Sequence, residues 1–224
     1  MTEARDRGGP QEFGNAEANL RFLKTTGALT PGVEVLEIGT GTGGMLHELL
    51  RRGVRARGVE IDPTLIAESR TWFGDLPVQL VSGIALPFQD GSFDRVLSFD
   101  VFEHIKDSVA HLREVSRVLR PGGRYLVQTP SKWPNTVFET IRWRSFARWR
   151  DDHCALHTPG ELRRRLEAHG FTARFVDVPV VNAFFRKKVR RHLGWPGAAV
   201  LTLVNPDRLP LGWRTNVYVD AIKT

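Results

Sequence analysis

The chain has few of the features that mark secreted or membrane-spanning proteins. Its 224 residues contain a single cysteine, Cys154, so no internal disulfide framework is available, and this usage is compatible with a reducing compartment. No apolar run reaches about 18 residues, which argues against a transmembrane helix. The first ten residues are polar and charged, and they lack the apolar core of a secretory signal. We therefore expect a cytoplasmic protein.

Cations outnumber acids, with a formal net charge of +7 and an isoelectric point of about 10.2. Such a balance suits nucleic acid, an anionic membrane surface or acidic substrates as partners. Arginine heavily outnumbers lysine, however, and a GC-rich coding bias produces the same pattern without any partner. The charge alone therefore identifies no ligand.

Strand-like and helix-like patterns alternate along the chain. Strands are expected at residues 33–38, 56–61, 78–81, 93–99, 124–129, 173–180 and 216–222, and helices at 13–24, 43–52, 63–73, 109–119 and 159–169. Asp62 and Thr158 are the expected N-caps of two of these helices. Alternation of this kind predicts an α/β fold with a Rossmann-like, doubly wound sheet. Residues 31–224 would form one domain, preceded by a disordered N-terminus and a capping helix within residues 1–30.

The most informative stretch follows the first expected strand. Gly39, Gly41 and Gly43 come at alternate positions after an apolar run, where glycine permits a tight turn and a close backbone approach to a ligand. The next helix points free N–H groups at the same place. No lysine lies within residues 39–52, which argues against a phosphate-binding loop ending in Gly-Lys-Ser/Thr. Glu37, just before the glycines, would repel a pyrophosphate and suits a cationic ligand.

Four segments, in order, resemble the motifs of class I S-adenosylmethionine-dependent methyltransferases. They are Glu37-Ile38-Gly39-Thr40-Gly41-Thr42-Gly43, Gly58-Val59-Glu60-Ile61-Asp62, Leu86-Pro87-Phe88-Gln89-Asp90-Gly91-Ser92-Phe93-Asp94 and Val118-Leu119-Arg120-Pro121-Gly122-Gly123. The resemblance covers about residues 30–180 and is strongest to the small-molecule enzymes of the ubiquinone-biosynthesis and type 11 group. It implies a seven-stranded sheet with helices on both faces and an antiparallel last strand. It also implies S-adenosylmethionine as methyl donor and S-adenosylhomocysteine as product.

The resemblance implies cofactor roles by position. Glu37 is expected to face the methionine ammonium, Glu60 to accept both ribose hydroxyls, and Ile61 to lie against the adenine. The other expected cofactor-lining residues are Gly39, Thr40, Gly41, Gly43, Ser82, Gly83, Ile84 and Phe99. Ser82 departs from the family, which usually has Asp there to accept from the adenine amino group. Because a neutral hydroxyl accepts a weaker bond, we expect a modestly weaker cofactor affinity.

The sequence argues against some acceptors more clearly than it identifies one. The Asn/Asp-Pro-Pro-aromatic motif of amino-directed nucleic-acid methyltransferases is absent after the fourth strand, and Cys154 follows His153 instead of the proline that precedes a carbon-five nucleophile. Both absences point away from nucleic acid. We predict O-methylation of a hydroxyl on a small or medium-sized metabolite, such as a lipid-linked, quinone-like or glycosidic acceptor. The alternatives are N- or C-methylation of a small molecule, and a partner subunit that binds the cofactor without turnover.

A hydroxyl acceptor must lose its proton to a nearby histidine or carboxylate. His153 is the first candidate for base or acceptor-orienting group, with Asp152 setting its tautomer, and the alternative is a histidine that only pins its loop. His104 is the second candidate, although it would serve equally to bond the next helix. The expected acceptor pocket is lined by Asp100, Phe102, Trp133, Trp143 and Trp149. Asp100 alone does not make a carboxylate cluster, so no metal is predicted.

Two insertions interrupt the alternating pattern. Residues 131–158 interleave aromatic residues with arginines, and the resemblance implies a lid that either grips the acceptor or packs on its own core. Residues 182–214 contain the stretch 184–193, which places apolar residues on one helical face and cations mostly on the other. This composition suits peripheral contact with an anionic membrane, and equally a surface helix packed on the sheet.

Overall fold

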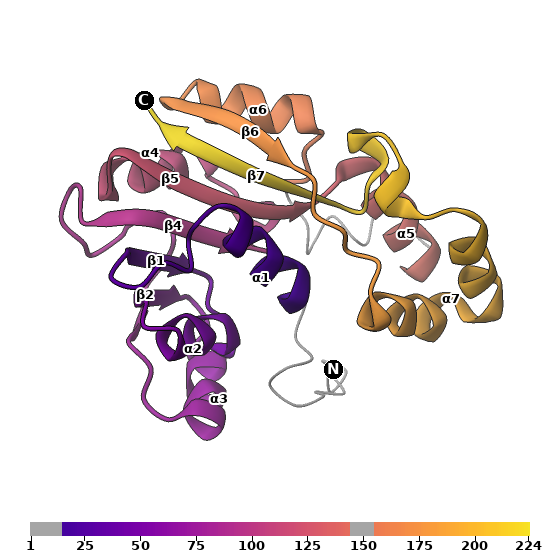
Figure 1. Ribbon diagram of the computed structural model, residues 1–224, viewed down its shortest axis with the longest axis horizontal. Helices are drawn as coiled ribbons and strands as arrows, with labels where there is room; N and C mark the ends of the chain where they lie inside the picture. The colour runs from indigo at the N-terminus through magenta and orange to yellow at the C-terminus, as the bar shows by residue number, and fades with distance from the viewer. Residues whose placement is uncertain (1–14, 144–154) are drawn as a thin grey trace.

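The computed structural model describes residues 15–143 and 155–224, which form a seven-stranded sheet covered by helices on both faces (Figure 1). The strands are β1 (Glu34–Ile38), β2 (Arg55–Glu60), β3 (Val78–Leu80), β4 (Phe93–Phe99), β5 (Leu119–Pro130), β6 (Phe171–Val176) and β7 (Asn216–Lys223). Their order across the sheet is β3-β2-β1-β4-β5-β7-β6. β7 runs antiparallel to β5 and β6, and the other neighbours are parallel. The predicted α/β fold with an antiparallel last strand is confirmed.

Side chains of the central strands alternate between two buried layers. The helices around them are α1 (Ala16–Thr25), α2 (Gly44–Arg51), α3 (Pro63–Phe73), α4 (Ser108–Val118), α5 (Lys132–Trp143), α6 (Pro159–Glu167) and α7 (Ala183–Leu203). Leu36 and Val127 belong to the layer shared with α4 and α6, whereas Val35 and Leu126 belong to the layer shared with α1 and α2. Successive strand residues point to opposite faces, so burial of both faces explains the unbroken apolar runs.

The helix α1 ties the N-terminal part of the chain to the sheet. Phe22 and Leu23 are fully buried, and the Tyr218 hydroxyl of β7 donates to Asn19 Oδ1 (3.1 Å). The capping helix predicted from the sequence is therefore part of the core. Its predicted start at Phe13, and the disorder predicted before it, lie outside the described residues.

Two helix starts follow the cap residues that the sequence predicts. The Asp62 carboxylate accepts from the backbone N–H of Thr64 (2.8 Å) at the start of α3. Thr158 and Glu161 form a reciprocal capping box at the start of α6. The hydrogen bond from the Thr158 backbone holds the pKa of Glu161 at about 2. These caps satisfy N–H groups that the first helical turn leaves without partners.

Two strand boundaries differ from the sequence pattern by more than two residues. β5 begins at Leu119 instead of 124, because residues 121–123, expected as a turn, lie inside the strand where its register with β4 shifts. A shift of this kind is a bulge, which lets a Pro-Gly-Gly segment remain within a ladder. β6 ends at Val176, earlier than the predicted residue 180.

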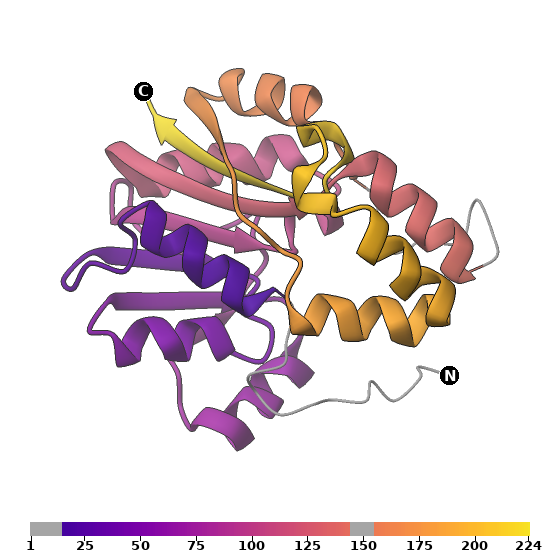
Figure 2. The same cartoon turned by 45° about the vertical axis from the view of Figure 1, so that its right-hand side comes forward.

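Helices occupy much of both insertions and lie together at one end of the sheet (Figures 1 and 2). α5 follows β5 directly, and α7 lies between β6 and β7. The ring of Phe138 in α5 meets that of His192 in α7 edge to face, with 6.2 Å between centroids. α7 extends beyond the predicted stretch 184–193, because its two halves meet at a kink where Gly194 has a φ of 62°.

Candidate active site

The glycine loop leaves β1 through three left-handed glycines. Gly39, Gly41 and Gly43 have φ angles of 74°, 55° and 82°. A Cβ on Gly39 would overlap the side chain of Val101, in the segment that follows β4. A Cβ on Gly41 would meet no atom within 4 Å. The loop is therefore packed against the end of β4 on one side and open at Gly41, where a ligand can approach the backbone.

Glu37 lies next to this loop in β1, with only 4% of its surface exposed. Its Oε2 has no hydrogen-bond partner within the described chain. Burial, together with the nearby charge of Glu60, raises the pKa of Glu37 to about 8. A buried carboxyl oxygen without a partner is costly, so this position is suited to a cationic donor supplied from outside. The methionine ammonium of S-adenosylmethionine fits that requirement.

Glu60, at the end of β2, holds the glycine loop from the neighbouring strand. Its carboxylate accepts backbone N–H groups of Gly41 (2.7 Å), Ile61 (2.8 Å) and Asp62 (3.1 Å). A carboxylate has about four acceptor sites, so these bonds leave little spare capacity. Two ribose hydroxyls would therefore have to displace at least one backbone N–H group. The ribose role of Glu60 stays a prediction.

Apolar side chains are exposed where the adenine is expected. Ile61 at the end of β2 is 69% exposed, and Leu80 and Ile84, in and after β3, are also exposed. Exposed apolar side chains that gather at one edge indicate a surface that a ligand covers. The Ser82 hydroxyl accepts only a long hydrogen bond from the Ile84 N–H (3.4 Å), which leaves it acceptor capacity for an adenine amino group. Leu80 was not predicted, since its β-strand position carries no cofactor motif.

His111 of α4 holds this turn from inside the core, and no sequence motif indicated it. Its Nδ1 lies 2.8 Å from the Gly83 carbonyl oxygen, and its Nε2 lies 2.7 Å from the Tyr125 hydroxyl. Because a carbonyl only accepts, Nδ1 carries the proton and Nε2 accepts from Tyr125. Burial lowers the pKa of His111 to about 4, so the ring is neutral at physiological pH. A Cβ on Gly83 would lie 2.8 Å from Ile38, so the turn sits directly on the core.

Asp100 is the first residue after β4, in the segment where the acceptor is expected to bind. It is the one non-glycine residue with a positive φ, 53°, among those described. Its N–H donates to the Gln128 carbonyl (3.1 Å), and its Oδ1 accepts from Gln128 Nε2 (2.9 Å). Gln128 is fully buried, and Val101, the next residue after Asp100, packs against Gly39. Gln128 therefore holds the Asp100 carboxylate, one residue before the contact with the glycine loop, and its positive φ is of the kind that clusters at functional sites.

The segment after Asp100 forms η1 (Phe102–His104) beneath the same edge of the sheet. Phe102 was predicted to line the acceptor pocket, but its ring is fully buried in the core, 5.7 Å from the His111 ring. The prediction is therefore wrong for this conformation, because the 3-10 turn directs the side chain inward. Glu103, which was not predicted, is buried and accepts from Thr129 Oγ1 (3.0 Å). Burial and the charge of Asp100 raise the pKa of Glu103 to about 8.

The other predicted acceptor-side residues are only partly covered by the structure. Those outside the described residues are His153, Asp152 and Trp149, and the side chain of Trp143 is not described either. His104 is exposed, and so is Trp133, whose ring centroid lies 5.9 Å from Lys132 Nζ. Phe99, which was predicted to line the cofactor site, is half-buried and meets Phe22 of α1 edge to face. Within residues 15–143 and 155–224, no three His, Cys, Asp or Glu side chains group so as to hold a metal ion.

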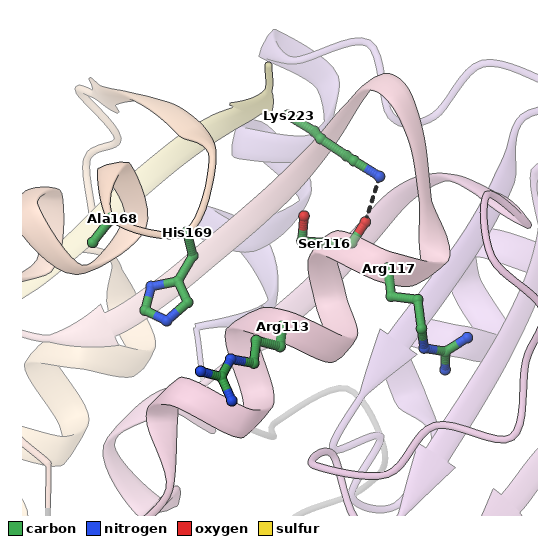
Figure 3. A pocket seen from close by; sticks show the side chains of 6 residues that line it. All are labelled: Arg113, Ser116, Arg117, Ala168, His169 and Lys223. Carbon is green, nitrogen blue, oxygen red and sulfur yellow. Dashed lines mark hydrogen bonds between the residues drawn. The ribbon is translucent and has the colours of Figure 1, made fainter.

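A separate hollow of about 410 Å³ lies between α4 and the end of α6 (Figure 3). It is lined by Arg113, Ser116, Arg117, Ala168, His169 and Lys223. The Lys223 ammonium donates to the carbonyls of Ser116 (2.6 Å) and Leu119 (2.8 Å), which α4 leaves without helical partners. Since β7 is antiparallel, Lys223 lies at the amino ends of the parallel strands. The hollow is therefore at the opposite edge from the glycine loop.

The segment that contains the glycine loop is similar to known proteins. Residues 36–127 match the family described as methyltransferase domain, and this range contains Glu37, Glu60 and Asp100. Over this range the chain is similar to methyltransferases, as the relatives below illustrate.

Two relatives and one solved structure illustrate the similarity. The chain is 34% identical to a demethylmenaquinone methyltransferase of Tropheryma whipplei (strain Twist) over 44% of this chain and 42% of the relative. It is 30% identical to a ubiquinone biosynthesis O-methyltransferase of Xanthomonas axonopodis pv. citri (strain 306), over 58% of this chain and 56% of that relative. Phosphoethanolamine N-methyltransferase 2 of Haemonchus contortus, solved in complex with S-adenosylmethionine, shares the fold with a TM-score of 0.66 at 20% identity, over 95% of this chain and 55% of that one. The chain spans about half the length of the curated relatives that it matches.

Proposed function

We propose that the protein transfers the methyl group of S-adenosylmethionine to a hydroxyl oxygen of a small or medium-sized metabolite. The observation that carries this proposal is Asp100, a carboxylate held by buried Gln128 and followed directly by Val101, which packs against the glycine loop. A neutral amine needs mainly positioning to attack a methyl group, whereas a hydroxyl must also lose its proton. A carboxylate held at this place serves the hydroxyl reaction.

The proposed reaction is a single in-line displacement. The acceptor oxygen forms a bond to the methyl carbon while the bond from carbon to the sulfonium sulfur breaks. S-adenosylhomocysteine leaves with a neutral sulfur, and the hydroxyl proton passes to a protein base. Asp100 is one candidate base, and His153, oriented by Asp152, remains the candidate predicted from the sequence.

The cofactor is proposed to lie across the carboxyl ends of β1, β2 and β3. Glu37 would pair with its ammonium, and Glu60 with its ribose, as predicted. Exposed Ile61 and Ile84 would cover the adenine faces, and the Ser82 hydroxyl would accept from its amino group. For the acceptor, the names of the two similar enzymes, from menaquinone and ubiquinone metabolism, favour a quinone-like or lipid-linked molecule.

The test is an acceptor panel with matched variants. Purified protein and S-adenosylmethionine are incubated with hydroxyl and amine compounds of similar size, and methylated products are identified by mass spectrometry. Asp100→Asn is expected to lower kcat by on the order of 10²–10⁴-fold without changing the Kd for S-adenosylhomocysteine. Asp90→Asn is the matched control, because Asp90 is an exposed carboxylate on the 86–92 loop. His153→Ala tests the other base in the same assay.

The outcomes separate the candidate functions. Loss of turnover in His153→Ala with full activity in Asp100→Asn would make His153 the base and leave O-methylation standing. Methylation confined to amine or carbon acceptors would overturn O-methylation. Tight cofactor binding without any product across the panel would favour a partner subunit that binds the cofactor without turnover.

A further inference from the structure

Large apolar side chains are exposed along α5, along α7 and on η4 (Leu211–Trp213). On α5 they recur every four residues and so share one helical face: Trp133, Val137 and Ile141. Beyond the kink of α7, Trp195 is 80% exposed and Leu203 is 85% exposed. Seven of the fourteen exposed large apolar side chains in the described ranges belong to these segments, and an eighth, Val204, directly follows α7. A concentration of this kind marks an interaction surface.

Among the side chains that the structure describes, α7 exposes cations, and neither α5 nor α7 exposes an acid. Arg186, Lys187, Arg190 and Arg191 are exposed on the first half of α7, and α7 contains no Asp or Glu. The acid of α5, Glu139, is buried. The exposed charge described on these helices is therefore positive, and it lies on α7.

The elements that carry these residues are neighbours, because α5 and α7 lie side by side in both views (Figures 1 and 2) and α5 packs against η4, and we treat the residues as one surface. We call it the α5–α7 surface. It comprises Trp133, Val137, Ile141, Arg186, Lys187, Arg190, Arg191, Trp195, Val200, Leu203, Val204 and Trp213. α5 starts where β5 ends, so the surface lies toward the edge of the sheet that carries the glycine loop.

We propose that the α5–α7 surface docks the protein on a bilayer of anionic phospholipids. Exposed tryptophan, leucine and valine side chains would enter the interfacial region, and the cations would pair with phosphate groups. None of the helices in the part of the chain that the structure describes is long and apolar enough to cross a bilayer, so the contact would be peripheral. A surface of this composition does not suit a second copy of the chain, because cations would then face cations.

The exposed apolar side chains of this surface lie outside residues 184–193, where the sequence pattern predicted an apolar face. Val189 is buried, so the apolar face predicted for residues 184–193 points inward at that position. The exposed apolar side chains come instead from α5 and from the half of α7 beyond Gly194. Residues 186–191 keep the predicted role of supplying cations.

Vesicle flotation of the full chain tests the proposal without any acceptor or turnover, so its outcome is independent of the proposed function. We expect binding to vesicles that contain phosphatidylglycerol, weak binding to phosphatidylcholine alone, and loss of binding at high salt. Arg186→Gln combined with Arg190→Gln is expected to lower the partition coefficient roughly 30-fold, given the contribution of each cation near an anionic surface. Trp195→Ser combined with Leu203→Ser is expected to lower it by at least on the order of tenfold.

Matched variants elsewhere on the molecule are expected to have no effect. Arg113→Gln with Arg164→Gln removes two exposed cations of α4 and α6, and Trp72→Ser removes an exposed tryptophan of α3. Affinity for S-adenosylhomocysteine confirms that each variant is folded. Absence of binding to phosphatidylglycerol vesicles at low salt would overturn the proposal, as would equal losses in the control variants. A dimer that Trp195→Ser with Leu203→Ser abolishes, without vesicle binding, would assign the surface to a second copy.

Discussion

The protonation of Glu37 predicts how cofactor affinity depends on pH. In the ligand-free protein, burial and the charge of Glu60 raise the pKa of Glu37 to about 8, so the carboxyl is mostly protonated at neutral pH. A protonated carboxyl pairs poorly with the methionine ammonium, whereas the ionised form makes a charge-assisted hydrogen bond. The arriving cation favours the ionised form, so binding should release the proton.

The size of the effect follows from that pKa. At pH 6, about one Glu37 in a hundred is ionised in the free protein. Affinity should therefore rise about tenfold per pH unit from pH 6 to 7, or about 1.4 kcal/mol per unit. Above about pH 8 the α-amino group of the cofactor itself loses its charge, so affinity should fall again. The binding curve is expected to have a maximum near pH 8.

Titration calorimetry with S-adenosylhomocysteine, in buffers of different ionisation enthalpy, measures both affinity and proton release. We expect close to one proton released per cofactor at about pH 6.5. Glu37→Gln should bind more weakly at pH 8 and release no proton. Glu34→Gln, at the other end of β1, is the matched control and should behave like the unmodified protein. A Kd that is the same at pH 6 and pH 7.5, or binding without proton release, would refute the reasoning.

Three further substitutions test the cofactor side by equilibrium binding. Gly39→Ala should abolish cofactor binding, because its Cβ would overlap Val101 and its left-handed backbone disfavours alanine; normal affinity would contradict this contact. Ser82→Asp should improve the Kd for S-adenosylhomocysteine severalfold, since a carboxylate accepts more strongly than a hydroxyl; no gain would count against an adenine contact. Tyr125→Phe removes the donor to His111 Nε2, and should weaken cofactor binding about tenfold while binding of methionine alone is unchanged.

The prediction of the cofactor side depends on local signals. A buried strand, alternating glycines and an acid at fixed offsets all fall within residues 33–43. Glu60 follows at the end of the next strand, and in an open parallel sheet neighbouring strand ends meet at one edge. The structure places Glu37 and Glu60 close enough for the charge of one to affect the other.

Contacts between distant segments were not predictable from spacing. The partner of His111 is the Gly83 carbonyl, 28 positions away, and a histidine on a helix face has many other potential partners. The positive φ of Asp100 depends on Gln128 in β5. The inward turn of Phe102 depends on a 3-10 helix whose sequence resembles an ordinary loop. Such features depend on tertiary packing, which no local pattern encodes.

The protonation of Glu37 also predicts a cost to the stability of the ligand-free protein. Unfolded, Glu37 would titrate near 4.5, whereas in the folded chain its pKa is about 8. Between these values the folded state binds a proton that the unfolded state lacks, so the free energy of unfolding falls as pH rises. Glu37→Gln cannot ionise, and its Tm should exceed that of the unmodified protein at pH 8, by roughly 2–4 °C for each kcal/mol recovered. Near pH 4.5 the two Tm values should converge, and saturating S-adenosylmethionine should reverse their order at pH 8. A Glu37→Gln variant that melts no higher than the unmodified protein at pH 8 would show that the buried carboxylate does not lower the free energy of unfolding.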